Sequence, residues 1–122
     1  MIQTEDIENI IERNPEVFEG LKDEVIKKFT DWYIHPQNMT IINLFERETR
    51  RVKEFRKRDY FSARVIFEHI RWQTLAEDTN IEYKISNNVC SCIVRIVVFM
   101  NPDFEGMFRM RSRAVEEEEL TI

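Results

Sequence analysis

Apolar residues recur every three or four positions through the first half of the chain, a spacing typical of amphipathic helices. We expect a first helix over 5–13 with Thr4 as its N-cap, and a second helix that runs unbroken over 15–33. Residues 35–38 contain Pro36 and are predicted to form a loop. A third helix follows this loop. Its predicted apolar stripe consists of Ile41, Phe45, Val52 and Phe55.

The second half of the chain changes its pattern from one element to the next. A fourth helix is expected over 62–77, and because its apolar residues lie on nearly all sides it should be buried at the centre of the fold. Residues 81–85 alternate between apolar and polar, which predicts a short strand. Capping residues at 86–88 predict a fifth helix over 89–100, although its β-branched residues fit a strand equally well. One or two helical turns are expected over 102–108.

These elements predict a mainly α protein, a compact helical domain with a short β element. The chain has only two Gly and three Pro, too few for the turns of a β-sandwich or barrel. We expect one domain over 1–115, made of N-terminal helices (1–58) and a helix–strand–helix unit (60–113), before an acidic tail (116–122) predicted to be disordered. The order of elements in the second half resembles a winged helix-turn-helix, with its recognition element and wing in 102–113.

Charge is distributed unevenly along the chain. Residues 1–40 carry four Lys or Arg against nine Asp or Glu, a net charge of −5, and residues 114–122 carry four Glu and no base, a net charge of −4. Residues 41–113 carry fourteen Lys or Arg against ten Asp or Glu, a net charge of +4. The total of −5 therefore conceals a basic centre between acidic ends.

The basic centre contains the candidate binding residues. Lys and Arg neutralise phosphates and release their counterions without reading the base sequence. We therefore predict that a cationic ridge on the third helix, with further polar residues behind it, engages nucleic acid. The candidates are Arg50, Arg51, Lys53, Arg56, Lys57, Arg58, Arg71, Lys84, Asn87, Arg95, Arg109, Arg111 and Arg113.

Three of these candidates have structural alternatives. Asn87, together with Asn88, is most simply explained as a cap of the fifth helix. Arg71 and Arg95 lie on otherwise apolar helices, where pairing with carboxylates or exposed carbonyls would also explain them.

No catalytic or metal-binding motif is present in the sequence. Cys90 and Cys92 could give two soft ligands, but a structural zinc site needs four, and the two His residues are not paired at ligand spacing. His69 could serve a Cys nucleophile as a base, yet no local motif supports that reaction. Glycine-rich phosphate loops, signal peptides and membrane-spanning stretches are absent from the sequence. We expect no metal, no cofactor and no membrane contact, and reduced thiols in a cytoplasmic protein.

The second half of the chain contains a set of short motifs. They are Tyr60-Phe61-Ser62-Ala63-Arg64, Ile66-Phe67-Glu68-x-Ile70-Arg71-Trp72, Tyr83-Lys84-Ile85-x-Asn87-Asn88, Arg95-x-x-x-Phe99-Met100-x-Pro102 and Gly106-Met107-Phe108-x-x-Arg111. With these motifs, residues 60–111 resemble a family of small, largely uncharacterised proteins of bacteria and their phages. The resemblance implies a bacterial or phage origin and favours a helix for the fifth segment, but it implies no activity.

Together these features favour a non-catalytic accessory or regulatory binding protein that engages nucleic acid through its basic second half. The alternative is a protein-binding inhibitor or cofactor of a nucleic-acid-processing complex, such as a defence nuclease, to which the acidic ends and the phage-like resemblance point. Exposed aromatic residues such as Trp32 and Tyr33 would suit a protein contact, although core packing explains them as well. The oligomeric state is open, with a homodimer among the options.

Overall fold

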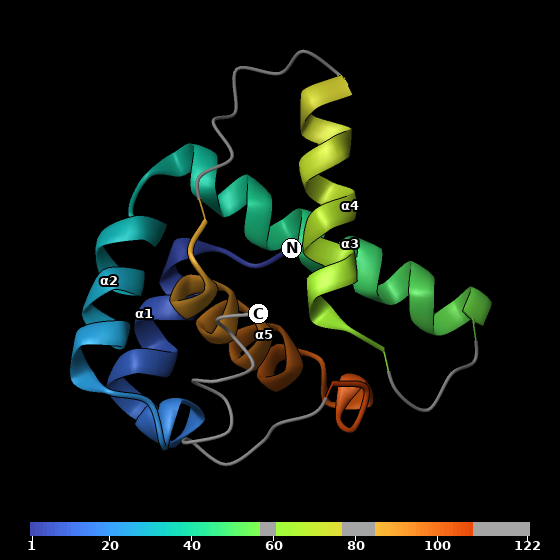
Figure 1. The fold of residues 1–122 in the computed structure, drawn as a ribbon. Coiled ribbons are helices and arrows are strands. Elements are labelled where there is room, and N and C mark those ends of the chain that lie inside the picture. The colour runs from blue at the N-terminus through green and yellow to red at the C-terminus, as the bar shows by residue number, and fades with distance from the viewer. Residues whose placement is uncertain (57–60, 77–84, 109–122) are drawn as a thin grey trace.

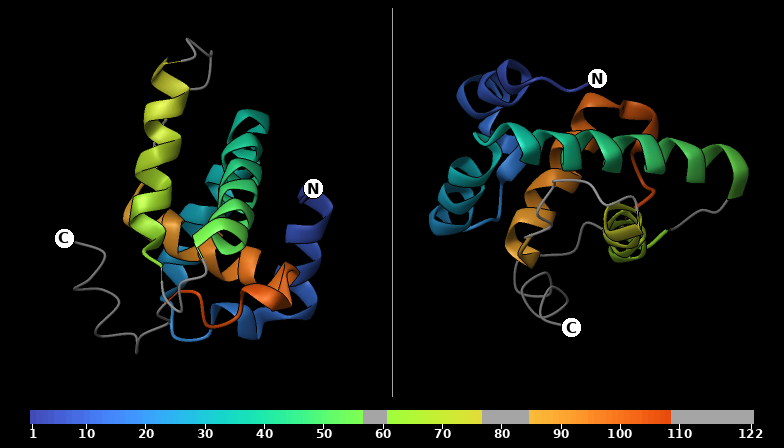
Figure 2. Two further views of the ribbon diagram at one scale, coloured as in Figure 1. Left: turned by 90° about the vertical axis from the view of Figure 1, so that its right-hand side faces the viewer. Right: turned by 90° about the horizontal axis from the view of Figure 1, so that it is seen from above.

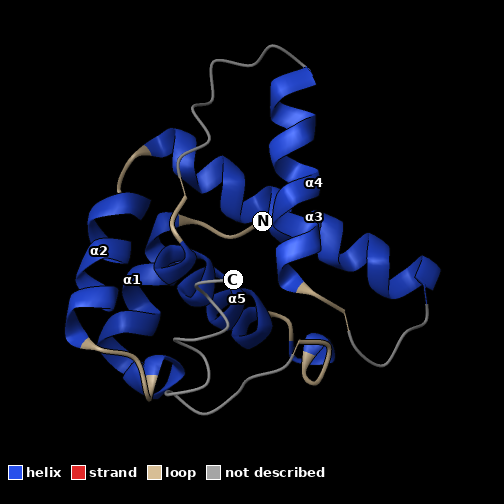
Figure 3. Ribbon diagram, viewed as in Figure 1, coloured by secondary structure: helices blue, strands red, loops and turns tan. Residues whose placement is uncertain are grey.

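The computed structural model describes residues 1–56, 61–76 and 85–108, and these are mainly helical (Figures 1 and 3). The elements are the helices α1 (Thr4–Arg13), α2 (Asp23–Tyr33), α3 (Pro36–Arg56), α4 (Ala63–Ala76) and α5 (Asn87–Met100), with the short 3-10 helices η1 (Pro15–Phe18) and η2 (Pro102–Phe104). No strand is present in these ranges. The strand expected over 81–85 falls, except for Ile85, outside the described residues, as do the arm at 109–113 and the tail at 116–122.

Helix α5 lies at the centre of the described structure. α2 and η1 pack against it, and α3 and η2 cover further parts of its surface. Ser86 is its N-cap and accepts a hydrogen bond on Oγ from the Val89 amide at 3.3 Å, so the expected cap at Asn87 and Asn88 lies one residue earlier. The helix prediction for this segment is confirmed, because burial on several sides outweighs the strand propensity of its residues. Its buried residues are Val89, Cys92, Ile93, Val94, Ile96 and Val97.

The prediction that the fourth helix is the buried central one is wrong. α4 packs mainly on α3, and its C-terminal end extends beyond the other helices (Figures 1 and 2). Only one of its faces joins the core, through Ile66, Phe67 and Ile70. Val65, Trp72 and Leu75 of the same helix are exposed, so apolar content on all sides does not mark the centre of this fold.

The expected helix over 15–33 is interrupted. The chain forms η1 after Asn14, then turns through Gly20, whose φ of 90° lies in the left-handed region that favours glycine. α2 begins only at Asp23. Arg95 of α5 stabilises this turn, because its Nη1 donates to the carbonyls of Val17 and Glu19 at 3.2 and 3.1 Å.

The prediction of a loop over 35–38 is also wrong, since α3 already begins at Pro36. Proline fits the first helical position because it needs no intrahelical amide hydrogen bond there. Asn38 is buried, and its Nδ2 donates to the carbonyl of Trp32 at 2.8 Å, which satisfies the end of α2. The cap of the first helix also differs from the prediction. α1 begins at Thr4, so its N-cap is Gln3 and not Thr4.

Aromatic residues form two groups within the core. Phe29 of α2 packs against Phe18, Trp32 and Tyr33 with ring centroids 5.3–6.3 Å apart, so core packing explains the two aromatic residues at the end of α2. The second group joins α3 to α4: Phe45 stacks on Phe67 with ring centroids 4.4 Å apart and also contacts Phe108, at 5.7 Å. The amide of Phe61 also donates to the carbonyl of Met107 at 2.8 Å, which fixes the chain just before α4.

Helix α3 provides a matched test of this core. Phe45 is fully buried, whereas Phe55 on the same helix is 77% exposed, contrary to its expected place on the apolar stripe. We expect Phe45→Ala to lower the free energy of unfolding by about 3–5 kcal/mol, because it removes the ring between α3 and α4 and leaves a cavity. Phe55→Ala should change it by less than about 0.5 kcal/mol. Urea unfolding of both variants checks this, and similar losses would contradict the described packing.

Candidate functional site

Arg50 and Lys53 lie on α3 where this helix meets η2, and both bind Asp103 there. Arg50 pairs with the Asp103 carboxylate, donates from Nη2 to Asn101 Oδ1 at 2.9 Å, and stacks over the Phe104 ring at 4.3 Å. Lys53 donates to the backbone carbonyl of Asp103, and its Nζ lies 3.6 Å from Oδ2. These side chains hold η2 against α3, so a phosphate would have to compete with Asp103 for them.

Arg51 is occupied by a second internal carboxylate, that of Glu48. Its Nη1 lies 3.1 and 3.3 Å from the two oxygens of Glu48, whose side chain is only 7% exposed. Arg47 approaches the same carboxylate at 3.3 Å, and His69 of α4 lies 3.7 Å from it. A carboxylate so deeply buried needs such partners to offset its lost hydration. Arg51 therefore forms an ion pair within α3, on a carboxylate that also lies near His69 of α4.

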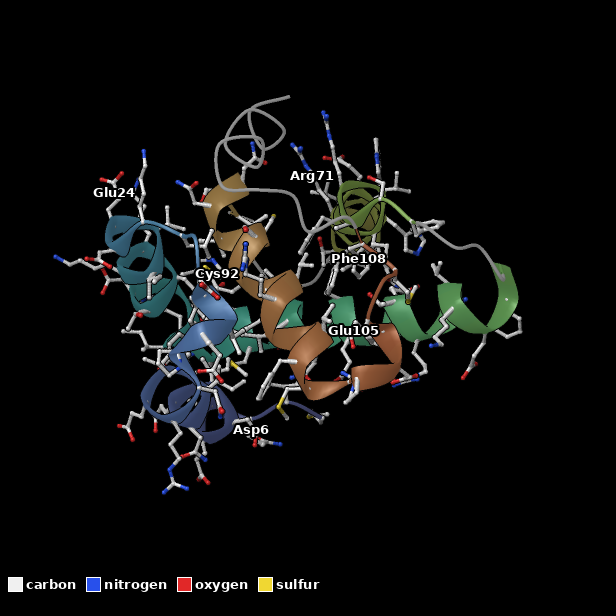
Figure 4. All side chains as sticks on the ribbon, turned by 90° about the horizontal axis from the view of Figure 1, so that it is seen from below. Asp6, Glu24, Arg71, Cys92, Glu105 and Phe108 are labelled. Carbon is white, nitrogen blue, oxygen red and sulfur yellow. The ribbon has the colours of Figure 1, made fainter. Side chains whose placement is uncertain are left out.

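The remaining described candidates are not part of the cationic ridge on α3. Arg95 binds the carbonyls at the end of η1, which confirms the structural alternative for this residue. Asn87 is exposed in the first turn of α5, and Arg71 is exposed on α4. Figure 4 shows Arg71 directed away from the body of the molecule. The described candidates thus do not converge on one site.

The other candidates fall where the structure describes no side chain. They are Arg56, whose backbone ends α3, and Lys57, Arg58, Lys84, Arg109, Arg111 and Arg113.

Cys92 is buried on α5 (Figure 4), and Cys90 on the same helix is partly buried. Burial raises the pKa of both thiols to about 12, so neither is ionised near neutral pH. His69 is instead mostly exposed on α4, where it faces Glu48. Among the described residues, no three His, Cys, Asp or Glu side chains are grouped in a way that could hold a metal ion.

The most unusual surface of the described chain is the side of α4 that faces away from α3. Val65, Trp72 and Leu75 are 55, 70 and 64% exposed there. With Glu68 between them, their spacing of three, four and three residues places them along one side of the helix. We call this surface, formed by Val65, Glu68, Trp72 and Leu75, the outer face of α4. Exposed apolar clusters of this kind mark contact sites more often than isolated exposed residues do.

Two arginines border the outer face of α4. Arg64 and Arg71 are seven residues apart, which places them on the same side of the helix, and both are exposed. Within the ranges that the structure describes, neither arginine nor Glu68 takes part in an ion pair or side-chain hydrogen bond, in contrast to Arg50, Arg51 and Lys53. Trp and Arg are the residues most enriched at the energetic centres of protein interfaces.

The sequence contained a signal for this surface. The fourth helix has more apolar positions than one core face requires, since Val65, Trp72 and Leu75 lie opposite Ile66, Phe67 and Ile70. A helix that is apolar on two sides is either buried or exposes a contact face, and the pattern alone favoured burial.

Comparisons with protein-family models, with curated proteins and with solved structures found no match for this chain. In the described part of the chain, no helix is both long and apolar enough to cross a membrane. The function must therefore be inferred from the surface itself.

Substitutions at Arg50 and Arg71 should distinguish an arginine that stabilises the fold from one that is exposed and unpaired in the described structure. We expect Arg50→Gln to lower the free energy of unfolding by about 1–2 kcal/mol, because it removes a partly exposed ion pair and a cation–π contact. Arg71→Gln should change it by less than about 0.5 kcal/mol, because this side chain is exposed and unpaired in the described structure. Thermal and urea unfolding measure both, and an equal effect would contradict the assigned roles.

Acid should weaken the contact between α3 and η2. The hydrogen bond from Arg50 is the main reason why the pKa of Asp103 lies below its ordinary value. The folded state therefore binds its proton less readily than the unfolded state, and the stabilisation is present at neutral pH and lost as the pH falls below about 4. We expect Asp103→Asn to lower the melting temperature at pH 7 and to lose this effect towards pH 2. A difference that widened in acid would show the opposite sign.

Proposed function

We propose that this protein is a non-catalytic binding module that contacts another polypeptide through the outer face of α4. The observation that carries the proposal is the exposure of Val65, Trp72 and Leu75 on the side of α4 opposite its core face. Covering these side chains would remove apolar surface from water, which stabilises a complex by about 25 cal/mol per Å² before the costs of association.

The rim of this surface also suits a protein partner. Arg64 and Arg71 are exposed, and Glu68 lies between them on the same side. Charges of both signs around an apolar centre steer and orient a protein partner. Aliphatic side chains such as Val65 and Leu75 gain nothing from phosphates, and Glu68 would repel them.

The prediction of nucleic-acid binding stays a prediction. Three of its residues, Arg50, Arg51 and Lys53, already bind carboxylates within the fold. The winged helix-turn-helix would place its recognition element in 102–113, where the described residues form the short 3-10 helix η2 packed on α5. Its strand and wing would have to be supplied by 81–85 and 109–113. The bacterial or phage origin, and a role beside a nucleic-acid-processing complex, belong to the proposal in the same way.

The non-catalytic part of the proposal rests on the placement of the reactive side chains. Cys92 is buried in the core, Cys90 is partly buried against it, and burial raises the pKa of both thiols, whereas His69 lies at the surface beside Glu48. A thiol nucleophile would need a base within hydrogen-bonding reach and access to a substrate. Neither thiol has that environment in the described structure.

Site-specific photo-crosslinking in cells would identify what contacts the outer face of α4. We would replace Trp72 with the photo-reactive amino acid benzoylphenylalanine, which keeps an aromatic side chain at this exposed position. After irradiation and nuclease treatment, we expect a discrete protein adduct on denaturing gels. Adding Leu75→Ala should weaken it, because the substitution removes neighbouring contact area.

The matched control is the same replacement at Ile34, which is 59% exposed between α2 and α3. It should yield no comparable adduct. If Trp72 gives no protein adduct, or one whose mobility depends on attached nucleic acid, the proposed protein-binding function is wrong.

A further inference from the structure

The outer face of α4 is complementary to itself when two copies of the helix run antiparallel. In an antiparallel pair related by a two-fold axis, residues on opposite sides of the axis meet across the interface. If the axis passes next to His69, Val65 faces Trp72 of the second copy. The same register brings Glu68 beside the second copy's Arg71. One arrangement therefore pairs apolar with apolar and acidic with basic side chains.

The charged pair also lies on the correct edge for this arrangement. Glu68 and Arg71 are three residues apart and occupy the same edge of α4, and a two-fold axis brings equal edges of two antiparallel helices together. Both side chains are exposed, and neither has an ion partner among the described residues. Each dimer would therefore gain the Glu68–Arg71 contact twice without breaking an existing one.

The position of α4 permits such an approach. Val65, Trp72 and Leu75 are exposed on the side of α4 opposite its core face, and the C-terminal end of this helix extends beyond the other helices (Figure 2). Its fourteen residues span about 21 Å. One helix face of this length is small compared with the roughly 800 Å² that each partner buries in a stable complex. Self-association through it would be weak and reversible.

We infer that the partner of the outer face of α4 is a second copy of this chain, bound as an antiparallel α4 pair with Val65 against Trp72 and Glu68 against Arg71. The inference rests on the proposed function, because it names the polypeptide that this surface binds.

Charge exchange across the interface tests the inference on the purified full chain. Glu68→Arg alone or Arg71→Glu alone places like charges opposite each other and should weaken dimerisation about tenfold or more. An equimolar mixture of the two variants should restore it, because each charge then meets an opposite charge in the mixed dimer. Sedimentation velocity from about 10 μM to 1 mM, a range suited to small interfaces, measures these changes.

The controls separate association from folding. Trp72→Ala should abolish the concentration dependence and Ile34→Ala should leave it unchanged, while circular dichroism and melting temperature stay constant for all variants because the altered side chains are exposed. A chain that stays monomeric up to 1 mM, or single variants that dimerise like the wild type, would overturn the inference. So would a mixture that fails to restore the dimer.

The two proposals can fail separately. If crosslinking at Trp72 captures a different protein and the purified chain remains monomeric, the protein-binding function stands and the second copy is excluded as its partner. If no protein adduct forms at all, the function itself is wrong.

Discussion

Burial of α5 is the constraint on which the arrangement of the other elements depends. Its Ile and Val side chains lie around most of the helix, so neighbouring elements must cover several of its sides at once. α2 and η1 supply one part of this cover, and α3 and η2 supply others. Arg95 ties the turn after η1 to α5, and Arg50 with Lys53 ties η2 to α3. With α5 enclosed in this way, α4 is left on the outside and joins the core through one face only.

The same arrangement explains why the basic centre of the chain does not form a continuous cationic surface. Folding brings Asp103 to Arg50 and Lys53, and it buries Glu48 beside Arg51. These cations stabilise contacts between elements and are less available to an external phosphate. Arg64 and Arg71 form no ion pair in the described structure, and they are exposed on α4, which packs mainly on α3. The exposed arginines of the basic centre that form no ion pair among the described residues therefore border the outer face of α4, which includes Trp72.

The candidate site could be predicted only in part. Helical periodicity located the start of α4 within a residue and showed its excess of apolar residues, which include Val65, Trp72 and Leu75. Periodicity does not state how many faces of a helix are covered, because that number depends on which other elements pack nearby. The choice between Arg50 as a phosphate ligand and Arg50 as an internal partner was equally inaccessible, since Asp103 is 53 residues away in sequence.

The sequence by itself determined the mainly α class, the start of α5 near Ser86 and the short turn at Pro102, because these follow from apolar spacing, capping residues and the fixed backbone of proline. It misplaced the boundaries at Gly20 and Pro36, where turn geometry and helix-end hydrogen bonds from Arg95 and Asn38 decide. Only the tertiary structure decided that α5 rather than α4 is central, and that Trp72 is exposed. Both depend on long-range packing, in which burying one apolar helix on several sides leaves the other with a face in water.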